Sequence, residues 1–204
     1  MLEDQTLFRE LLVKLLQAEP GFELAGTASE GRSGIELLET VEADLLLLDI
    51  QLPDLDGLEL ADELARRHPD LRIMALTSLQ DRWTVQRIME CGLAGYVEKD
   101  QPIQILTEAM RTIAEGGCYF TERFAATRRR MAADPVSFHK ILSKREQQVL
   151  SEVAGGASTS DIARKLKLSE RTVGNHRYNL MKKLELKNAS ELTAYAIKHG
   201  FRRL

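Results

Sequence analysis

The sequence has little cysteine and no long apolar run, and both shortages limit what the chain can be. Its 204 residues include two cysteines, Cys91 and Cys118. Two thiols cannot build a disulfide framework, which indicates a reducing compartment. No run approaches the roughly 18 apolar residues that a membrane-spanning helix needs, and the first residues lack the pattern of a secretory signal peptide. We therefore expect a soluble, cytoplasmic protein with no membrane partner.

Histidine is scarce as well, and no histidine pattern indicates a metal centre. The four histidines, His68, His139, His176 and His199, are far apart in the sequence and lack metal-ligand spacing. Hydrophobic residues, at 44%, are as frequent as in ordinary globular proteins. A chain of this length can therefore form one large or two small domains, each with a core.

The net charge of −3 hides an uneven distribution along the chain. Residues 138–204 contain 14 lysines and arginines against 6 acidic residues, a net charge of +8, whereas residues 1–137 carry −11. This asymmetry predicts that only the second part of the chain meets a polyanion. The alternative is an uneven surface charge without a function.

Short apolar strands alternate with amphipathic helices over the first 116 residues. We predict strands over residues 22–28, 45–48, 73–77 and 95–98, and helices over residues 6–19, 33–41, 58–67, 82–91 and 103–115. This alternation predicts an α/β domain with a doubly wound parallel sheet and helices on both faces.

The stretch from Asp44 to Gly57 is the centre of this first domain. Four successive leucines predict a strand that is buried on both faces, and Asp49 follows at its carboxyl end. Ligands bind at that edge of an open α/β sheet, where an aspartate can attack phosphorus and form an aspartyl phosphate. A strand that simply ends in a solvated aspartate is the alternative.

Polar side chains at the other strand ends complement Asp49. Asp4 and Asp49, with the backbone carbonyl of Gln51, provide hard oxygen ligands for Mg²⁺. Thr77 and Lys99 provide a hydroxyl and an ammonium group for phosphoryl oxygens.

These motifs resemble the receiver domain of two-component response regulators, whose fold is flavodoxin-like. The resemblance covers residues 1–116 and implies that Asp49 accepts a phosphoryl group from a phosphohistidine on a sensor histidine kinase. It also implies that Asp4 and Asp49 hold Mg²⁺, that Glu3 does so through water, and that Thr77 and Lys99 contact the phosphoryl group. Tyr96 would be an aromatic switch that turns inward when Thr77 moves; a ring simply packed against the helix after Thr77 is the alternative. The matching residues are Glu3-Asp4, Asp49, Pro53, Asp56-Gly57, Thr77-Ser78 and Gly95 to Asp100.

The chain departs from the receiver pattern at its start. Receivers have a full apolar strand before the acidic pair, and here only Met1-Leu2 precede it. A two-residue central strand would leave neighbouring backbone groups unpaired. We therefore expect further residues upstream of Met1, without which Glu3 and Asp4 would be poorly held.

A linker, residues 117–140, follows the first domain and is predicted to be partly helical. Gly116-Gly117 break the chain, residues 121–133 can form a helix, and Asp134-Pro135 end it. The run Arg128-Arg129-Arg130 is typical of a solvated helix face, although contact with DNA phosphates or the acidic first domain is an alternative.

The second domain, residues 141–204, is predicted to be all-α with four helices. Ser143 and Glu146 have capping-box spacing, and a tight turn at Lys167-Leu168 separates two helices in the arrangement of a helix-turn-helix. In the helix over residues 169–184, Val173, His176, Leu180 and Leu184 form an inward stripe. The opposite face carries Arg171, Asn175, Tyr178 and Lys182, which suit a helix in the major groove; a solvated charged helix is the alternative.

This half resembles the LuxR-type DNA-binding domain through Leu142 to Glu146, Val149-Leu150, Ile162-Ala163, Leu168-Ser169, Thr172-Val173, His176 and Lys183-Leu184. The resemblance implies DNA contacts by the third helix and dimerisation by the fourth. Gly174 stands where that family usually carries a DNA-contacting lysine. The implied DNA-binding residues are Arg171, Thr172, Asn175, Arg177, Tyr178, Lys182 and Lys183, and the implied dimerisation residues are Leu192, Tyr195 and Ala196.

Together the two resemblances predict a transcription regulator that is switched by phosphorylation of Asp49 and is not an enzyme. Phosphorylated copies would form a homodimer on a two-fold double-stranded DNA operator. A constitutive DNA-binding protein with an unphosphorylated receiver is a second possibility. A phosphohydrolase is a third, but such enzymes place a second acid where Gln51 stands. The sequence names neither the kinase and its signal nor the operator.

Overall fold

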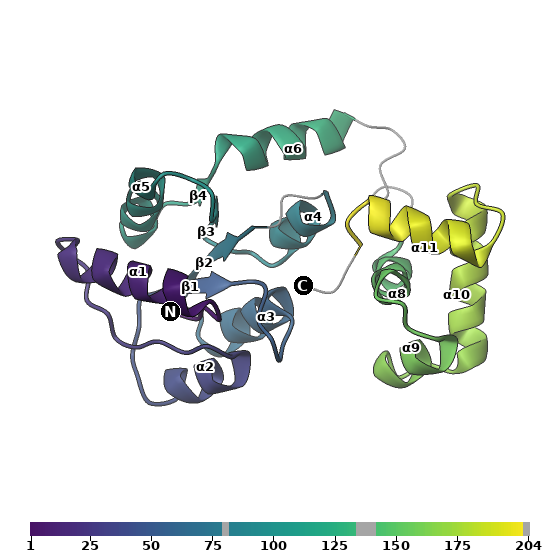
Figure 1. The fold of residues 1–204 in the computed structure, drawn as a ribbon, viewed down its shortest axis with the longest axis horizontal. Helices are drawn as coiled ribbons and strands as arrows, with labels where there is room; N and C mark the ends of the chain where they lie inside the picture. Colours follow the sequence, from purple (N-terminus) through teal and green to yellow (C-terminus); the bar gives the residue numbers. More distant parts are fainter. Residues whose placement is uncertain (79–81, 134–141, 202–204) are drawn as a thin grey trace. The chain divides into compact units, whose positions relative to one another are not determined.

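The computed structural model of the chain describes residues 1–78, 82–133 and 142–201. These residues form two compact units (Figure 1). The first is built on a sheet and contains most of residues 1–126, and the second is helical and contains most of residues 127–201. Residues 134–141, on which the end of the predicted linker falls, lie outside the described residues.

The first unit is the predicted α/β domain with a parallel sheet. Its strands pair in the order β1-β2-β3-β4, and every pair is parallel. The two-residue strand β4 was not predicted, because it is too short to show an alternating pattern. The strands are β1 (Leu45–Asp49), β2 (Arg72–Thr77), β3 (Gly95–Glu98) and β4 (Tyr119–Phe120), and the helices are α1 (Thr6–Ala18), α2 (Gly31–Leu38), α3 (Gly57–Arg67), α4 (Arg82–Glu90) and α5 (Ile103–Ala114).

The segment before α1 lies beside β1 in the sheet. Leu2 forms parallel bridges to Leu48 on one side and to Ala28 on the other. The prediction of a strand over residues 22–28 is wrong for most of its length, since only Ala28 is paired. The backbone of Met1 and Glu3 lies alongside residues 26–28. Met1 N donates to the Gly26 carbonyl, Ala28 N–H donates to the Met1 carbonyl, and Glu3 N–H donates to the Ala28 carbonyl.

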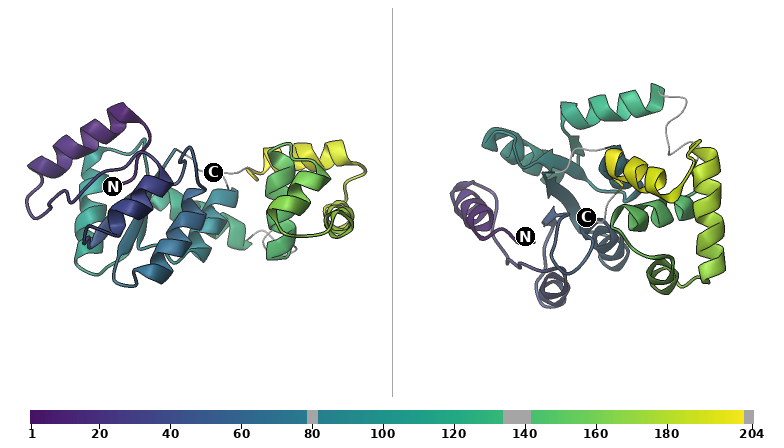
Figure 2. Two further views of the ribbon diagram at one scale, coloured as in Figure 1. Left: turned by 90° about the horizontal axis from the view of Figure 1, so that it is seen from below. Right: turned by 45° about the vertical axis from the view of Figure 1, so that its right-hand side comes forward.

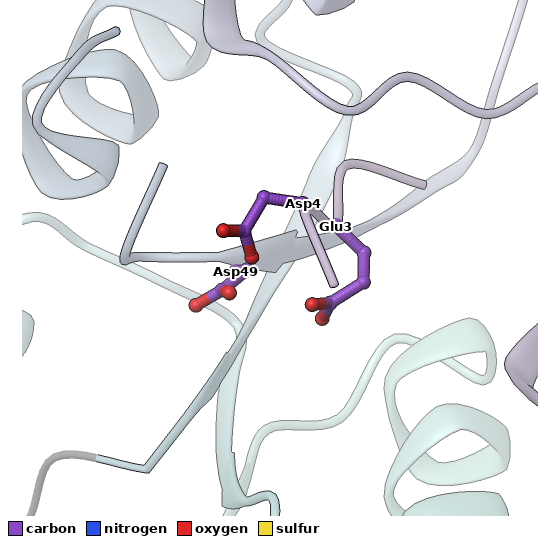
Figure 3. A group of neighbouring side chains, drawn as sticks. All are labelled: Glu3, Asp4 and Asp49. Carbon is purple, nitrogen blue, oxygen red and sulfur yellow. The ribbon is translucent and has the colours of Figure 1, made fainter. Parts of the chain in front are cut away.

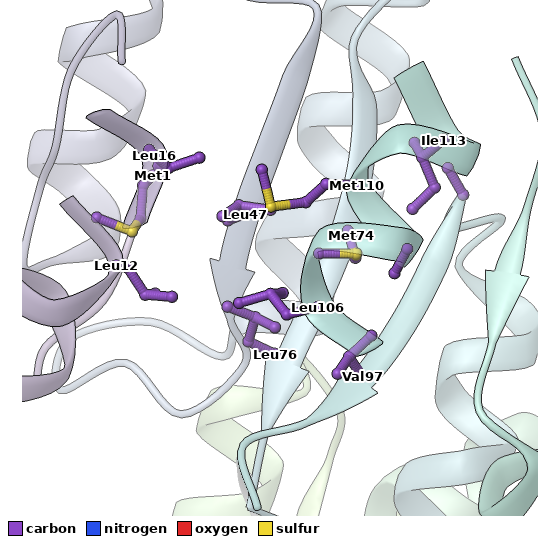
Figure 4. Close-up of a cluster of buried hydrophobic side chains, with 12 residues drawn as sticks. Met1, Leu12, Leu16, Leu47, Met74, Leu76, Val97, Leu106, Met110 and Ile113 are labelled. Atoms are coloured by element: carbon purple, nitrogen blue, oxygen red, sulfur yellow. The ribbon is translucent and has the colours of Figure 1, made fainter. Parts of the chain in front are cut away.

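Two layers of helices cover the sheet, with α1 and α5 on one face and α2 and α3 on the other (Figure 2). Successive residues of a strand point to opposite faces, so alternate apolar residues fill each layer. On the α1 and α5 face, Leu47, Met74, Leu76 and Val97 meet side chains such as Met110 (Figure 4). This core fixes the strands whose carboxyl ends carry the polar residues.

The second unit is the predicted four-helix domain. Side-chain caps begin its helices at Ser143, Ser158, Ser169 and Asn188, each accepting a hydrogen bond from a backbone N–H of the first turn. Among the described residues, no helix of the chain combines the length and apolar character that a bilayer crossing requires. The helices of this unit are α8 (Lys144–Ala154), α9 (Thr159–Lys165), α10 (Glu170–Lys183) and α11 (Ala189–Lys198), and α6 (Glu122–Ala133) precedes them in the chain.

Candidate functional site: an acidic pocket and an exposed recognition helix

Asp49 ends β1 at the carboxyl edge of the sheet, and both of its carboxylate oxygens are hydrogen-bonded. The Gln51 N–H donates to Oδ1 at 2.9 Å, and Lys99 Nζ donates to Oδ2 at 2.7 Å. The Asp49 backbone N–H donates to the Leu2 carbonyl at 2.9 Å. The residue is only 1% exposed. Asp49 is therefore held in one orientation on a rigid support.

Three carboxylates meet at this edge of the sheet. Glu3, Asp4 and Asp49 each offer an oxygen, and these oxygens lie within 4.8 Å of one another. In Figure 3 the carboxylates of Asp4 and Asp49 point toward each other. Glu3 Oε2 and Asp4 Oδ1 are buried without a hydrogen-bond partner among the described residues. Buried carboxylate oxygens left unpaired cost free energy, and a hard divalent cation satisfies them, so these residues fit Mg²⁺.

Arg9 binds the backbone of the acidic pair, Glu3 and Asp4. Its Nη1 donates to the Glu3 carbonyl at 2.6 Å and to the Asp4 carbonyl at 3.2 Å. The Gln5 N–H donates to Glu3 Oε1 at 3.1 Å. The pair is thus anchored on both sides of its backbone, although only two residues precede it in the sequence. This role of Arg9 was not predicted. The sequence does place Arg9 in the first turn of the helix that follows the acidic pair, from where its side chain can reach back to that pair.

Lys99 contacts the acidic residues through its side chain and the end of β2 through its backbone. Besides Asp49, its ammonium contacts Glu3 Oε1 at 2.8 Å, and it lies 4.9 Å from the centre of the Phe8 ring, a cation–π distance. The Lys99 backbone N–H donates to the carbonyl of Thr77, the fully buried last residue of β2. The predicted residues Asp49, Lys99 and Thr77 are therefore neighbours at one edge of the sheet.

Burial sets the protonation behaviour of the pocket. Loss of hydration raises the pKa of the Asp49 carboxyl, although the hydrogen bonds from Lys99 and the Gln51 N–H act in the opposite direction. Burial likewise raises the pKa of Glu3, against its bond from Lys99 and together with the negative charge of Asp49. The pocket therefore holds more negative charge than it can stabilise by itself, and added positive charge would lower both pKa values.

The predicted switch residue Tyr96 is 1% exposed. Its ring packs against Phe124 of α6, with centroids 5.0 Å apart and planes inclined by 42°. Glu98, two residues further along β3, is buried too. This contact of Tyr96 with α6 was not predicted, because nothing in the spacing of the sequence places α6 beside β3.

The outward face of α10 is as predicted from helical spacing. Arg171, Asn175, Tyr178 and Lys182 are all exposed, and Tyr178 reaches 64%. Val173 and Leu180 are fully buried on the other side. The exposed face therefore offers two cations, an amide and a phenol along one line of the helix.

Three other predicted DNA-binding residues make hydrogen bonds or ion pairs within their own domain. Arg177 Nη1 donates to Thr159 Oγ1 of α9 at 3.3 Å, and Lys183 Nζ pairs with Glu146 Oε2 of α8 at 2.8 Å. The Thr172 hydroxyl lies 2.7 Å from the capping Ser169 Oγ. Arg177 and Lys183 join α10 to α9 and α8, whereas Thr172 contacts the cap of its own helix. The part of all three residues in DNA binding stays a prediction.

The prediction that Leu192 and Ala196 make dimer contacts needs correction. Both side chains are 0% exposed, on the side of α11 that packs on α8. They hold their own domain together and present no surface to a second copy. Tyr195 is partly exposed and stacks on His199, with ring centroids 4.1 Å apart. The dimer role was implied only by the resemblance to the LuxR-type domain, which does not show which side chains of α11 are covered by α8.

Family comparisons match both units of the chain. Residues 1–111 match the model of the response regulator receiver domain, and residues 140–196 match that of the bacterial regulatory proteins of the luxR family. The matches cover the acidic pocket, Lys99 and all of α10.

Individual relatives span the whole chain. It is 30% identical to the transcriptional regulatory protein DegU of Brevibacillus brevis, over 98% of the chain and 93% of the relative. It is also 30% identical to the response regulator UvrY of Escherichia coli K12, with the same coverage. RcsB of Salmonella enterica, solved bound to a promoter in the presence of the phosphomimetic BeF3−, has the same fold, with a TM-score of 0.74 at 22% identity over 96% of this chain and 95% of that one. The chain belongs to the response regulators that join a receiver domain to a LuxR-type DNA-binding domain.

Proposed function

We propose that Asp49 accepts a phosphoryl group from a phosphohistidine of a sensor histidine kinase, and that this modification controls DNA binding. The observation that carries the proposal is the acidic cluster itself. It has a rigidly held carboxylate, a lysine on its Oδ2, and two buried carboxylate oxygens that find no partner in the part of the chain that the structure describes. Asp49 is the nucleophile toward phosphorus. As the new O–P bond forms, the P–N bond to the kinase histidine breaks and the histidine imidazole departs as the leaving group, taking up a proton. The chain is a phosphoacceptor rather than an enzyme that turns over a substrate.

Asp4 and Asp49 would hold the Mg²⁺, with the backbone carbonyl of Gln51 and, through water, Glu3. The ion supplies positive charge that offsets the charge of the transferred phosphoryl oxygens. Thr77, which ends β2, and Lys99, which follows β3, would provide the hydroxyl and ammonium donors for those oxygens. Before transfer, the Lys99 ammonium must leave Asp49 Oδ2 so that this oxygen can attack.

On DNA, we propose that α10 enters the major groove. Its exposed Arg171 and Lys182 suit phosphates or guanine, and Asn175 suits adenine. Two copies would span half-sites about 34 Å apart, one turn of the double helix, on a two-fold operator. Both cysteines are free thiols, in keeping with a cytoplasmic protein.

The burial of Asp49 favours a second possibility, a receiver that is never phosphorylated and only makes contacts. In that case Lys99 would neutralise Asp49 permanently, and DNA binding would be constitutive.

Intact-mass measurement after incubation with acetyl phosphate and Mg²⁺ separates the two possibilities. The phosphorylated form gains the mass of one phosphoryl group, and Asp49→Asn, which is isosteric but cannot form the acyl phosphate, gains none. Omission of Mg²⁺ should also prevent the gain. A wild-type mass that stays unchanged, or an equal gain in Asp49→Asn, would refute Asp49 as the acceptor.

A further inference from the structure

The strand β3 has two faces with different partners. Val97 and, just after the strand, Lys99 point to the face that holds the core of α1 and α5 and the acidic pocket. Tyr96 and Glu98 point to the opposite face, as the two-residue period of a strand requires. What they meet there is the beginning of α6.

Several contacts join residues 96–100 to residues 121–124, and the first of them is aromatic. Phe124, which is 2% exposed, packs against the buried Tyr96 ring. Phe120 of β4 packs on the same Phe124, with ring centroids 5.0 Å apart. The three rings form one cluster, so Tyr96 cannot change its position without moving Phe124 or losing contact with it.

The second contact is a buried hydrogen bond from Thr121, the residue just before α6. Thr121 Oγ1 donates to Glu98 Oε1 at 3.0 Å. The same Oγ1 accepts from the Phe124 N–H at 3.2 Å, and the Thr121 carbonyl accepts from the Ala125 N–H at 3.0 Å. Glu98 is therefore bonded directly to the cap of α6.

Glu98 also lies beside the phosphoryl-binding edge. It is the register partner of Thr77, so the two residues are neighbours on adjacent strands. Glu98 is 2% exposed, and its Oε2 has no hydrogen-bond partner among the described residues. A half-satisfied buried carboxylate responds strongly to any movement of the polar groups around it.

The third contact is an ion pair at the surface, between Arg123 of α6 and Asp100, two residues after the end of β3. Arg123 Nη1 donates to both carboxylate oxygens of Asp100, at 3.1 and 2.9 Å. About half of each side chain is exposed, so this ion pair adds little stability and mainly fixes the direction of the first turn.

We propose that β3 is a relay that couples the Asp49 pocket on one face to the first turn of α6 on the other, through Tyr96–Phe124 and Glu98–Thr121. This inference rests on the proposed phosphorylation of Asp49. Movement of Lys99 toward a phosphoryl group shifts the end of β3, which changes how firmly residues 122–125 are held. Because α6 leads along the chain to the DNA-binding unit, its first turn is the first part of the connector to respond.

Amide hydrogen exchange of the full-length chain, with and without beryllium fluoride and Mg²⁺, tests the relay. In the wild type we expect the exchange rates of the Phe124 and Ala125 amides to change by about fivefold or more, the lower end of ordinary coupling between sites. Glu98→Met and Phe124→Leu keep a similar volume but remove the hydrogen-bond acceptor and the ring, and each should reduce this change. Glu98→Gln keeps an acceptor for Thr121 and should restore it, and Arg128→Gln, farther along α6, is the matched control.

Fluorine NMR of bound beryllium fluoride keeps two failures apart. If the fluoride complex forms on Asp49 and the α6 amides do not respond, or respond equally in Glu98→Met and Phe124→Leu, the relay is refuted while phosphorylation of Asp49 stands. If no complex forms in the wild type, the proposed function itself is refuted, and the relay with it.

Discussion

At the scale of single residues, Glu146 combines two tasks in the DNA-binding unit. Its Oε2 accepts from the Ser143 N–H at 2.8 Å as part of a capping box, and it also accepts from Lys183 Nζ of α10 at 2.8 Å. Burial alone would raise the pKa of Glu146, but the bonds from Lys183 and Ser143 outweigh it, and the pKa is lowered. One carboxylate thus ties the start of α8 to the end of α10.

Glu146→Gln should destabilise the unit by about 1 kcal/mol at neutral pH, because glutamine keeps the capping geometry but loses the charge partner of Lys183. A carboxylate with a depressed pKa contributes stability above its unfolded pKa and loses it as the pH falls through the folded one. The difference between wild type and variant should therefore persist down to about pH 4.5, the ordinary pKa of glutamate, and shrink below it.

Denaturant unfolding, followed by helical circular dichroism from pH 7 down to pH 3, measures this difference. Glu152→Gln serves as a control, since Glu152 pairs with Lys165 and its side chain is more exposed than that of Glu146, 17% against 6%. A difference that grows in acid would contradict the assignment.

The pocket residues show why some roles were predictable from single positions. Asp49, Thr77 and Lys99 each end or follow a buried strand, so their convergence follows from parallel pairing alone. The contact of Glu98 with Thr121 was not predicted, since an acidic residue at a strand end is typical of solvent-exposed positions. Only the course of the chain after α5 makes it buried.

At the scale of elements, α10 has an exposed position without a side chain at Gly174. A Cβ added to Gly174 would meet nothing within 4 Å, and the residue is exposed. Glycine inside a helix costs up to about 1 kcal/mol relative to alanine. The helix therefore gives up both stability and a side chain at this position.

Gly174→Lys should tighten DNA binding about fivefold, equivalent to about 1 kcal/mol, and should make the slope of log affinity against log salt steeper by about 0.9, the value for one more phosphate contact. Gly174→Ala is the matched control: it should raise stability by about 0.5–1 kcal/mol and leave the salt slope unchanged. Fluorescence anisotropy with a labelled duplex at several salt concentrations measures both. Equal affinity and slope for the two variants would show that position 174 faces away from the phosphates.

Element boundaries in both units were mostly predictable, and the exceptions have physical causes. Helices such as α3 and α8 begin at side-chain caps visible in the sequence, Asp56 and Ser143. Residues 22–28 have the composition of a strand, but pairing needs a partner backbone, which composition does not reveal. Leu192 and Ala196 were assigned to a dimer surface by the resemblance to the LuxR-type domain, and a resemblance does not show which side chains their own domain covers.

At the scale of the whole molecule, the chain joins an acidic receiver to a basic DNA-binding unit. The residues up to 137 carry −11 and the rest +8. Phosphorylation adds negative charge to the acidic part only, so it does not weaken the attraction of α10 for DNA directly. The modification must act by changing contacts between copies or between parts of the chain.

Multi-angle light scattering of the full chain should therefore show a shift from monomer toward dimer when beryllium fluoride and Mg²⁺ are added. Asp49→Asn should keep the monomer mass under the same conditions, because it cannot form the fluoride complex. A dimer of equal strength in the wild type without beryllium fluoride would indicate the constitutive alternative.

The two ends of α10 carry a consequence for how this protein can diversify. Lys167 before the helix and Glu185 after it adopt left-handed backbone angles, with φ of 53° and 56°. These two turns and the buried side chains of Val173 and Leu180 determine the position of the helix in its domain. The exposed side chains Arg171, Asn175, Tyr178 and Lys182 are not needed for it. Operator preference can therefore drift by substitution on that outer face while the architecture of the domain is inherited intact.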